Sequence, residues 1–203
     1  MNVLKFSPEG FAVNTINAYR VLNPEQFSDK SALSFAMLVK AESTDYSSGY
    51  RAMFHIGMMN SLGSSVPMIR LQFTANNSFS VIARHSSADE VAEQVGMNGL
   101  TEGYNVIFVE LDYANKVIRT KLNGGAVVTK PAFAGTDGKN IVTPAAVAGL
   151  AGYLSSSGQA GRTTIFSGSL REMSIFAGPL TDSEITSVTD WLSAKSRQLN
   201  SSQ

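Results

Sequence analysis

The chain has 203 residues, no cysteine, and 16 acidic against 16 basic side chains. All-β sandwiches of this length are commonly one domain with one core. Without cysteine the chain has no disulfide, no thiolate metal site and no cysteine nucleophile. A net charge of zero argues against nucleic acid as a partner, because phosphate contacts need a basic face.

The sequence shows no targeting segment. Its first twenty residues lack the apolar run of about 7 to 15 residues that a secretory signal needs. No stretch approaches the roughly 18 apolar residues of a membrane span. We therefore expect no membrane contact, and synthesis in a cytoplasm without export by the general secretion route.

The first half of the chain predicts strands. Residues 31–40 alternate with period two, as a strand with one buried face does, and their inward side chains are Leu33, Phe35, Met37 and Val39. Residues 51–57 predict a second strand. Residues 68–84 predict a hairpin turning at Asn76 and Asn77, because asparagine tolerates left-handed backbone. Its first strand points Ile69, Leu71 and Phe73 inward, and Arg70, Gln72 and Thr74 outward.

A short helix is predicted over residues 87–95, where Ser87 and Glu90 have capping-box spacing. Residues 105–111 are apolar on both faces, which indicates a strand covered on each side. Residues 116–122 return after a turn, and residues 126–129 follow the turn at Asn123-Gly124. Residues 147–154 favour a strand, with a short helix opened by Pro144 as the alternative. Residues 163–166 and 168–176 complete the strands.

The carboxy-terminal segment predicts a helix over residues 181–196. Thr181 and Glu184 form a second capping box, and Leu180 and Ile185 have the spacing of a hydrophobic staple. Apolar residues then recur at helical spacing, which predicts a buried stripe made of Ile185, Val188, Trp191 and Leu192. After Lys195 the tail turns polar and is expected to fray.

Many short strands without strand–helix alternation predict a β-sandwich or barrel. Residues 166–195, with Gly168, Glu172 and the run Leu-Thr-Asp-Ser-Glu-Ile from Leu180, resemble the last strand and helix of laminin-G-like domains of the concanavalin A-like superfamily. VIFVELDYANKVIRTKLNGG and SALSFAMLVK resemble a hairpin and an early strand of the same family. The resemblance implies an all-β, concanavalin A-like jelly-roll sandwich over residues 30–203 with a carboxy-terminal helix. Residues 1–29 would pack on the domain edge or on a neighbour.

Glu110 and Asp112 are the candidate catalytic acids. Glycoside hydrolases that resemble this fold carry three acids as E-x-D-x-x-E on one strand. Here the sixth position is Asn115, and an amide cannot protonate a leaving oxygen. We interpret Glu110 as a strand-end residue and Asp112 and Asn115 as turn residues. No catalytic residue is therefore assigned, and a glycan hydrolase or lyase is the alternative.

Metal sites and cofactors are not predicted. The two histidines, His55 and His85, lie in or beside strands and are expected to pack rather than act. Calcium binding, which the resemblance to lectin-like domains raises, would use the loop 135–140, where Asp137 and Asn140 are the available ligands. Because no acids cluster there, the prediction is no metal, with calcium left open.

Candidate ligand-binding residues are those expected on outward strand positions or beside strands, namely Arg70, Gln72, Arg84, Arg119 and Tyr104. The predicted function is a non-catalytic binding or structural module. By analogy of fold and composition we expect a tailed-bacteriophage virion component, such as a fibre, tail-tip or capsid-decorating protein. Its partners would be other virion proteins, copies of itself, or a cell-surface glycan. A lectin subunit is a further alternative.

Overall fold

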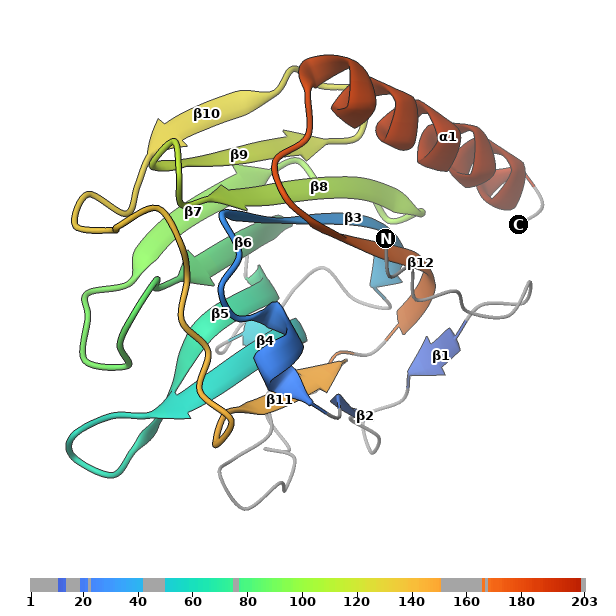
Figure 1. The fold of residues 1–203 in the computed structure, drawn as a ribbon. Coiled ribbons are helices and arrows are strands. Elements are labelled where there is room, and N and C mark those ends of the chain that lie inside the picture. The colour runs from blue at the N-terminus through green and yellow to red at the C-terminus, as the bar shows by residue number, and fades with distance from the viewer. Residues whose placement is uncertain are drawn as a thin grey trace.

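The computed structural model describes residues 11–13, 19–21, 23–41, 50–74, 77–150, 166 and 168–201. Two antiparallel sheets of six strands each face one another (Figure 1). The first sheet has the order β1 (Phe11–Val13), β12 (Gly168–Ala177), β3 (Ala32–Ala41), β8 (Asn105–Asp112), β9 (Val117–Leu122) and β10 (Val128–Pro131). The second has the order β2 (Tyr19–Val21), β11 (Val147–Leu150), β4 (Tyr50–Met59), β5 (Ser65–Thr74), β6 (Ser78–Ala83) and β7 (Glu93–Asn98). The predicted all-β jelly-roll sandwich is confirmed.

A continuous apolar core fills the space between the two sheets. Period-two alternation directs every second side chain of each strand into it, so the predicted inward residues of β3 and β5 are buried there. Aromatic side chains meet at its centre, where the ring of Phe35 lies 5.3 Å from that of Phe54. Phe27, in the 3-10 helix Pro24–Phe27, packs edge-on against Phe54 at 5.7 Å.

The outer face of the first sheet is covered by α1 (Asp182–Asn200), which crosses β3 and β8 (Figure 1). A second apolar cluster lies between them, made of Ala36, Leu38, Tyr104, Val106, Phe108, Ile185 and Leu192. The helix cover explains why β8 is apolar on both faces, and every residue of that strand is buried. Within the described ranges, no helix has the length and apolar character that crossing a bilayer requires.

The helix begins as predicted and ends later than predicted. The Thr181–Glu184 capping box is formed, with the Thr181 side chain accepting from the Glu184 N–H. The helix does not fray after Lys195, because its last turns are bonded to the loop before β8. The Ser196 hydroxyl donates to the Tyr104 carbonyl at 2.8 Å, and the Asn200 side-chain oxygen accepts from the Tyr104 N–H at 2.9 Å.

Trp191 does not pack into the sandwich, which corrects the expected buried stripe. Its side chain is 46% exposed, whereas Ile185 and Leu192 are buried. At 100° per residue, Trp191 lies about 120° around the helix from the line through Ile185, Leu192 and Ser196. The helix face toward the sheet is therefore completed by Thr189 and Ser196, both of which are buried.

The helix predicted over residues 87–95 is also wrong. Residues 88–90 form a single turn, in which the Glu90 carboxylate accepts from the Ser87 N–H at 3.2 Å. The chain then enters β7, where Val95 and Met97 alternate into the core and pair with β6. Val91, in the middle of the predicted helix, is 94% exposed. Burial of two alternating side chains outweighed the local cap signal.

The remaining predicted elements fall close to their expected positions. The hairpin β5–β6 is formed, and Asn77 adopts the left-handed backbone with φ 52°. The strand expected at residues 126–129 lies at Val128–Pro131, and β11 confirms the strand reading of residues 147–150. Residues 76, 151–154 and 163–165 of the predicted turn and strands lie outside the described residues. β1 and β2 pair with β12 and β11 at the outer edges of the two sheets.

Candidate functional site

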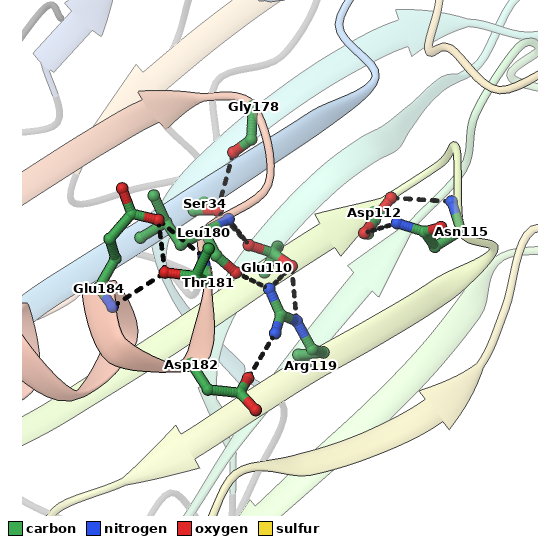
Figure 2. A network of polar contacts seen from close by, with 10 residues as sticks. All are labelled: Ser34, Glu110, Asp112, Asn115, Arg119, Gly178, Leu180, Thr181, Asp182 and Glu184. Carbon is green, nitrogen blue, oxygen red and sulfur yellow. Dashed lines mark hydrogen bonds and ion pairs between the residues drawn. The ribbon is translucent and has the colours of Figure 1, made fainter.

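Glu110, the candidate catalytic acid, is fully buried on the helix-covered face of β8 (Figure 2). Its carboxylate accepts from the Ser34 hydroxyl at 2.8 Å, from the Leu180 N–H at 2.7 Å and from Arg119 Nε at 2.7 Å. The Arg119 guanidinium also donates to the Leu180 carbonyl and forms an ion pair with Asp182 at 3.0 Å. These bonds tie β3, β8 and β9 to the start of α1.

Asp112 and Asn115 form the turn between β8 and β9, as predicted. The Asp112 carboxylate accepts from the Asn115 N–H at 2.9 Å and from its side-chain amide at 2.8 Å (Figure 2). A hollow of about 370 Å³ lies beside the turn, lined by Asp112, Asn115, Val117, Arg119, Pro179, Leu180 and Thr181. The two charged residues that line it are both bonded to protein groups, so the arrangement serves the fold.

The five predicted ligand-binding residues do not share one surface. Arg119 on β9 and Tyr104 just before β8 lie on the helix-covered side of the first sheet, where the Tyr104 hydroxyl accepts from Arg171 Nε at 2.8 Å. Arg84 follows β6 and donates to the carbonyls of Glu90, at 2.7 Å, and Pro67. Of the five, only Arg70 and Gln72 lie together. Side chains alternate along β5, so the core positions of Leu71 and Phe73 place Arg70 and Gln72 on the outer face of this strand.

Strand register places further polar residues around this pair. His55 on β4 is opposite Arg70, and Ser80 on β6 is opposite Gln72. The Arg70 guanidinium lies 3.8 Å above the centre of the Tyr50 ring. We call His55, Arg70, Gln72, Ser80 and Tyr50 the β4–β6 polar cluster. Sequence reasoning missed Tyr50, His55 and Ser80 as members, although the alternation in β4 and β6 could have placed them on the same face.

Gln72 is the most unusual member of the cluster. It is 4% exposed, and its side-chain nitrogen donates to the Ser80 hydroxyl at 2.8 Å. Its side-chain oxygen is buried, and among the described residues it has no hydrogen-bond partner. Because the two ends of an amide can be exchanged, either orientation leaves one end without a partner. Leaving such a group unpaired costs about 1–3 kcal/mol, so a partner supplied from outside the fold would be stabilising.

The structure shows the surroundings of both histidines and of the loop that was considered for calcium. His55 is fully buried, and His85 Nδ1 lies 2.7 Å from Glu90 Oε1. The Asn140 side chain bonds the Lys30 N–H and the Phe27 carbonyl, both at 2.8 Å, so it braces the fold. The described residues contain no group of three or more histidine, aspartate and glutamate side chains arranged to hold a metal ion.

Comparison with known proteins identifies the fold. No family model matches the sequence, and neither does any curated protein. The solved CBM40 module of the Ruminococcus gnavus IT-sialidase, bound to α2,3-sialyllactose, matches with a TM-score of 0.62 at 16% identity, over 89% of this chain and 95% of that one. NanB sialidase from Streptococcus pneumoniae matches with a TM-score of 0.65 at 14% identity, over 88% of this chain and 27% of that one.

A third similar structure comes from an animal protein. The heptameric SAP-like pentraxin of Limulus polyphemus matches with a TM-score of 0.58 at 9% identity, over 94% of this chain and 78% of that one. At these identities the likeness concerns the fold alone, and fold does not determine function. The three matches support the all-β sandwich fold of this chain.

Proposed function

We propose that this chain is a non-catalytic carbohydrate-binding module whose ligand site is the β4–β6 polar cluster. The observation that carries the proposal is the buried amide end of Gln72, which has no partner in the part of the chain that the structure describes. Because the amide is buried, a sugar must first displace the groups that cover it. The hydroxyl groups of the sugar both donate and accept, so they then supply the missing bond in either amide orientation. Buried polar groups are nearly always bonded, and an exception calls for a partner.

Arg70 and Tyr50 suggest the class of sugar. An arginine guanidinium recognises a carboxylate through two parallel hydrogen bonds, and here it already lies over the Tyr50 ring. Two of the similar solved structures contain α2,3- and α2,6-sialyllactose, whose terminal sugar carries a carboxylate. Sialylated oligosaccharides are therefore the ligands that we propose first.

The surroundings of Glu110 support a role without catalysis. A retaining or inverting hydrolase needs two carboxyl groups that both reach the scissile bond. Glu110 is buried, and its carboxylate is occupied by Ser34, Arg119 and Leu180. Asp112 is occupied by its own turn. The hydrolase or lyase alternative thus has no acid available at this position.

The virion role expected from the sequence stays a prediction. Its support is the resemblance to a concanavalin A-like module together with the absence of cysteine. Copurification of the chain with assembled phage particles would bear it out. A chain found only apart from such particles would contradict it and leave the carbohydrate proposal unaffected.

Isothermal titration with 3′-sialyllactose, 6′-sialyllactose and lactose tests the carbohydrate proposal. We expect binding of the sialylated sugars, weaker binding of lactose, and a loss on the order of tenfold for Gln72→Met, since one net hydrogen bond is removed. Arg70→Met should reduce the preference for sialyllactose over lactose. Thr129→Ala, at an exposed position of β10 in the other sheet, is the control expected to bind as wild type.

Two results would contradict the carbohydrate proposal. One is a folded wild-type protein that binds none of a broad set of immobilised glycans. The other is a Gln72→Met variant that melts like wild type and binds glycan equally well. Equal affinity for lactose and sialyllactose would overturn only the assignment of an acidic sugar and would leave the carbohydrate proposal standing.

A further inference from the structure

β7 forms the end of the second sheet and has one strand neighbour, β6, in the described part of the chain. Its pairing runs without a bulge from Ser78 opposite Asn98 to Ala83 opposite Glu93. The Arg84 N–H donates to the Met68 carbonyl at 2.7 Å, so Ile82, Ser80 and Ser78 also bond toward β5. The residues of β6 between them, Phe79, Val81 and Ala83, therefore bond Met97, Val95 and Glu93 of β7. The backbone groups of the remaining β7 residues, Gln94, Gly96 and Asn98, consequently point away from β6.

These outward groups form an open edge. Within the described ranges, no backbone hydrogen bond outside the sheet ladder involves the N–H or C=O of Gln94, Gly96 or Asn98. All three residues are exposed, and a Cβ built on Gly96 would meet no atom within 4 Å. Three alternate residues thus offer a regular row of donors and acceptors, which is a template for an added strand.

The other sheet edges are protected in ways that β7 is not. β10 ends in Lys130 and Pro131, and a proline at an edge removes a donor while a lysine opposes pairing. β1 and β2 are three residues long. β7 contains no proline, no lysine and no bulge.

We propose that β7 pairs with β7 of a second copy of this chain, antiparallel across a two-fold axis at Gly96. In this register Gly96 lies opposite Gly96 of the second copy, and Gln94 lies opposite Asn98, so each outward group finds a partner. On the core side Val95 lies opposite Met97, and both are apolar. Such an isologous pairing joins the two second sheets into one.

Charge favours a second copy as the occupant. The one ionisable residue of β7, Glu93, lies opposite Gly99 in this register, and its carboxylate accepts from the Phe133 N–H at 3.1 Å. No charged side chain of the strand therefore meets its own copy. The chain carries no net charge that would keep two copies apart.

The pairing also determines how the two ligand sites are presented. A two-fold axis between antiparallel strands stands perpendicular to the sheet, so both outer faces point to the same side. Five strand spacings of about 4.8 Å separate the two β5 strands, so the two β4–β6 polar clusters lie roughly 24 Å apart. This consequence rests on the proposed carbohydrate function, and it makes the dimer bivalent toward a glycan-bearing surface.

Sedimentation velocity across a range of concentrations tests the pairing with two matched double variants. Gln94→Lys with Asn98→Lys places like charges opposite each other twice, and should weaken the dimer on the order of tenfold. Gln94→Glu with Asn98→Lys places opposite charges at the same two contacts and should retain the dimer. Thr129→Lys, on the exposed edge strand β10, is the control expected to sediment as wild type.

Three outcomes would overturn the pairing. They are a wild-type chain that stays monomeric at the highest concentration, a dimer unaffected by Gln94→Lys with Asn98→Lys, and equal weakening by both double variants. Circular dichroism checks that each variant is folded. We expect that result because both positions are exposed and outside the core. The measurement needs no sugar, so a dimer that binds no glycan would refute the proposed function while leaving the edge pairing intact.

Discussion

Glu110 accepts hydrogen bonds from Ser34 on β3, from Arg119 on β9 and from Leu180 just before α1, so it joins the first sheet to the start of that helix. Burying a carboxylate is costly unless a charge and hydrogen bonds compensate it. Arg119 supplies the charge, and Ser34 and Leu180 supply neutral donors. The same residue in a solvated cleft would be a candidate acid, so its surroundings, and not its identity, make it structural.

Glu110→Gln should lower the free energy of unfolding by about 1–3 kcal/mol, because the charge that pairs with Arg119 is lost while the shape is kept. Glu110→Ala should cost about 3–5 kcal/mol, as when one partner of a buried pair is removed. Urea unfolding measures both. Asp182→Asn is the control, since Asp182 meets the same arginine but its side chain is 88% exposed, and exposed pairs contribute little. Equal effects at Glu110 and Asp182 would contradict this account.

Glu90 makes the free energy of unfolding depend on pH. Burial by itself would raise the pKa of Glu90, but the N–H groups of His85, Ser86 and Ser87 and the Ser86 hydroxyl hold that pKa below its ordinary value. A carboxyl whose pKa is lowered by folding contributes stability above its unfolded pKa, about 4.3. That contribution is lost as the pH falls through the lower, folded pKa.

We therefore expect the free energy of unfolding to fall on acidification below about pH 4.3, and to fall less in Glu90→Gln. Urea unfolding at a series of pH values between neutral and strongly acidic measures the slope. Thr129→Ala, at an exposed position of β10 that carries no ionisable group, is the control expected to keep the wild-type slope. A Glu90→Gln variant with the wild-type slope would show that this loop does not couple folding to pH.

At the scale of the element, α1 shows how helical geometry outweighs hydrophobicity. Thr189 and Ser196 are polar yet buried, and their hydroxyls bond the carbonyls of Ile185 and Tyr104, both at 2.8 Å. Trp191 lies on the flank, where Lys195 stands 4.0 Å from its ring centre and also pairs with Glu172 of β12. The spacing of the apolar residues predicted one buried stripe. Only positions within about 40°, measured around the helix axis, of the line through Ile185, Leu192 and Ser196 face the sheet.

Trp191→Ala should therefore cost less than about 1 kcal/mol, as for a surface site. Leu192→Ala should cost about 2–5 kcal/mol, as for other large core side chains. Thermal unfolding compares the two. The single tryptophan should also emit like a solvated indole and be readily quenched by acrylamide. Emission at short wavelength, or a greater loss from Trp191→Ala than from Leu192→Ala, would contradict the exposed placement.

At the scale of the whole molecule, the amino-terminal part contributes to both sheets. β1 borders β12 in the first sheet, β2 borders β11 in the second, and Phe27 reaches the core between them. Their contributions differ in kind, since the two strands cover sheet edges while Phe27 fills core volume.

Deleting residues 1–22 should therefore give a chain that folds with a lower Tm, because two edge pairings are lost. Deleting residues 1–28 also removes Phe27 and should cost roughly a further 3–5 kcal/mol, as for other buried phenylalanines. Thermal and urea unfolding of both truncations measure the difference. Two truncations of equal stability would show that Phe27 does not support the core.

The amino-acid pattern alone predicts the sandwich, the inward faces of β3 and β5, the two-sided burial of β8 and the start of α1. These features follow from alternation and capping, which act between residues a few positions apart. Tertiary structure decided the rest. Residues 87–95 carry a valid cap signal, yet the core drew Val95 and Met97 into a strand. Arg70 and Gln72 share a surface while Arg119 and Tyr104 lie under α1, because register and helix docking join residues far apart in the chain.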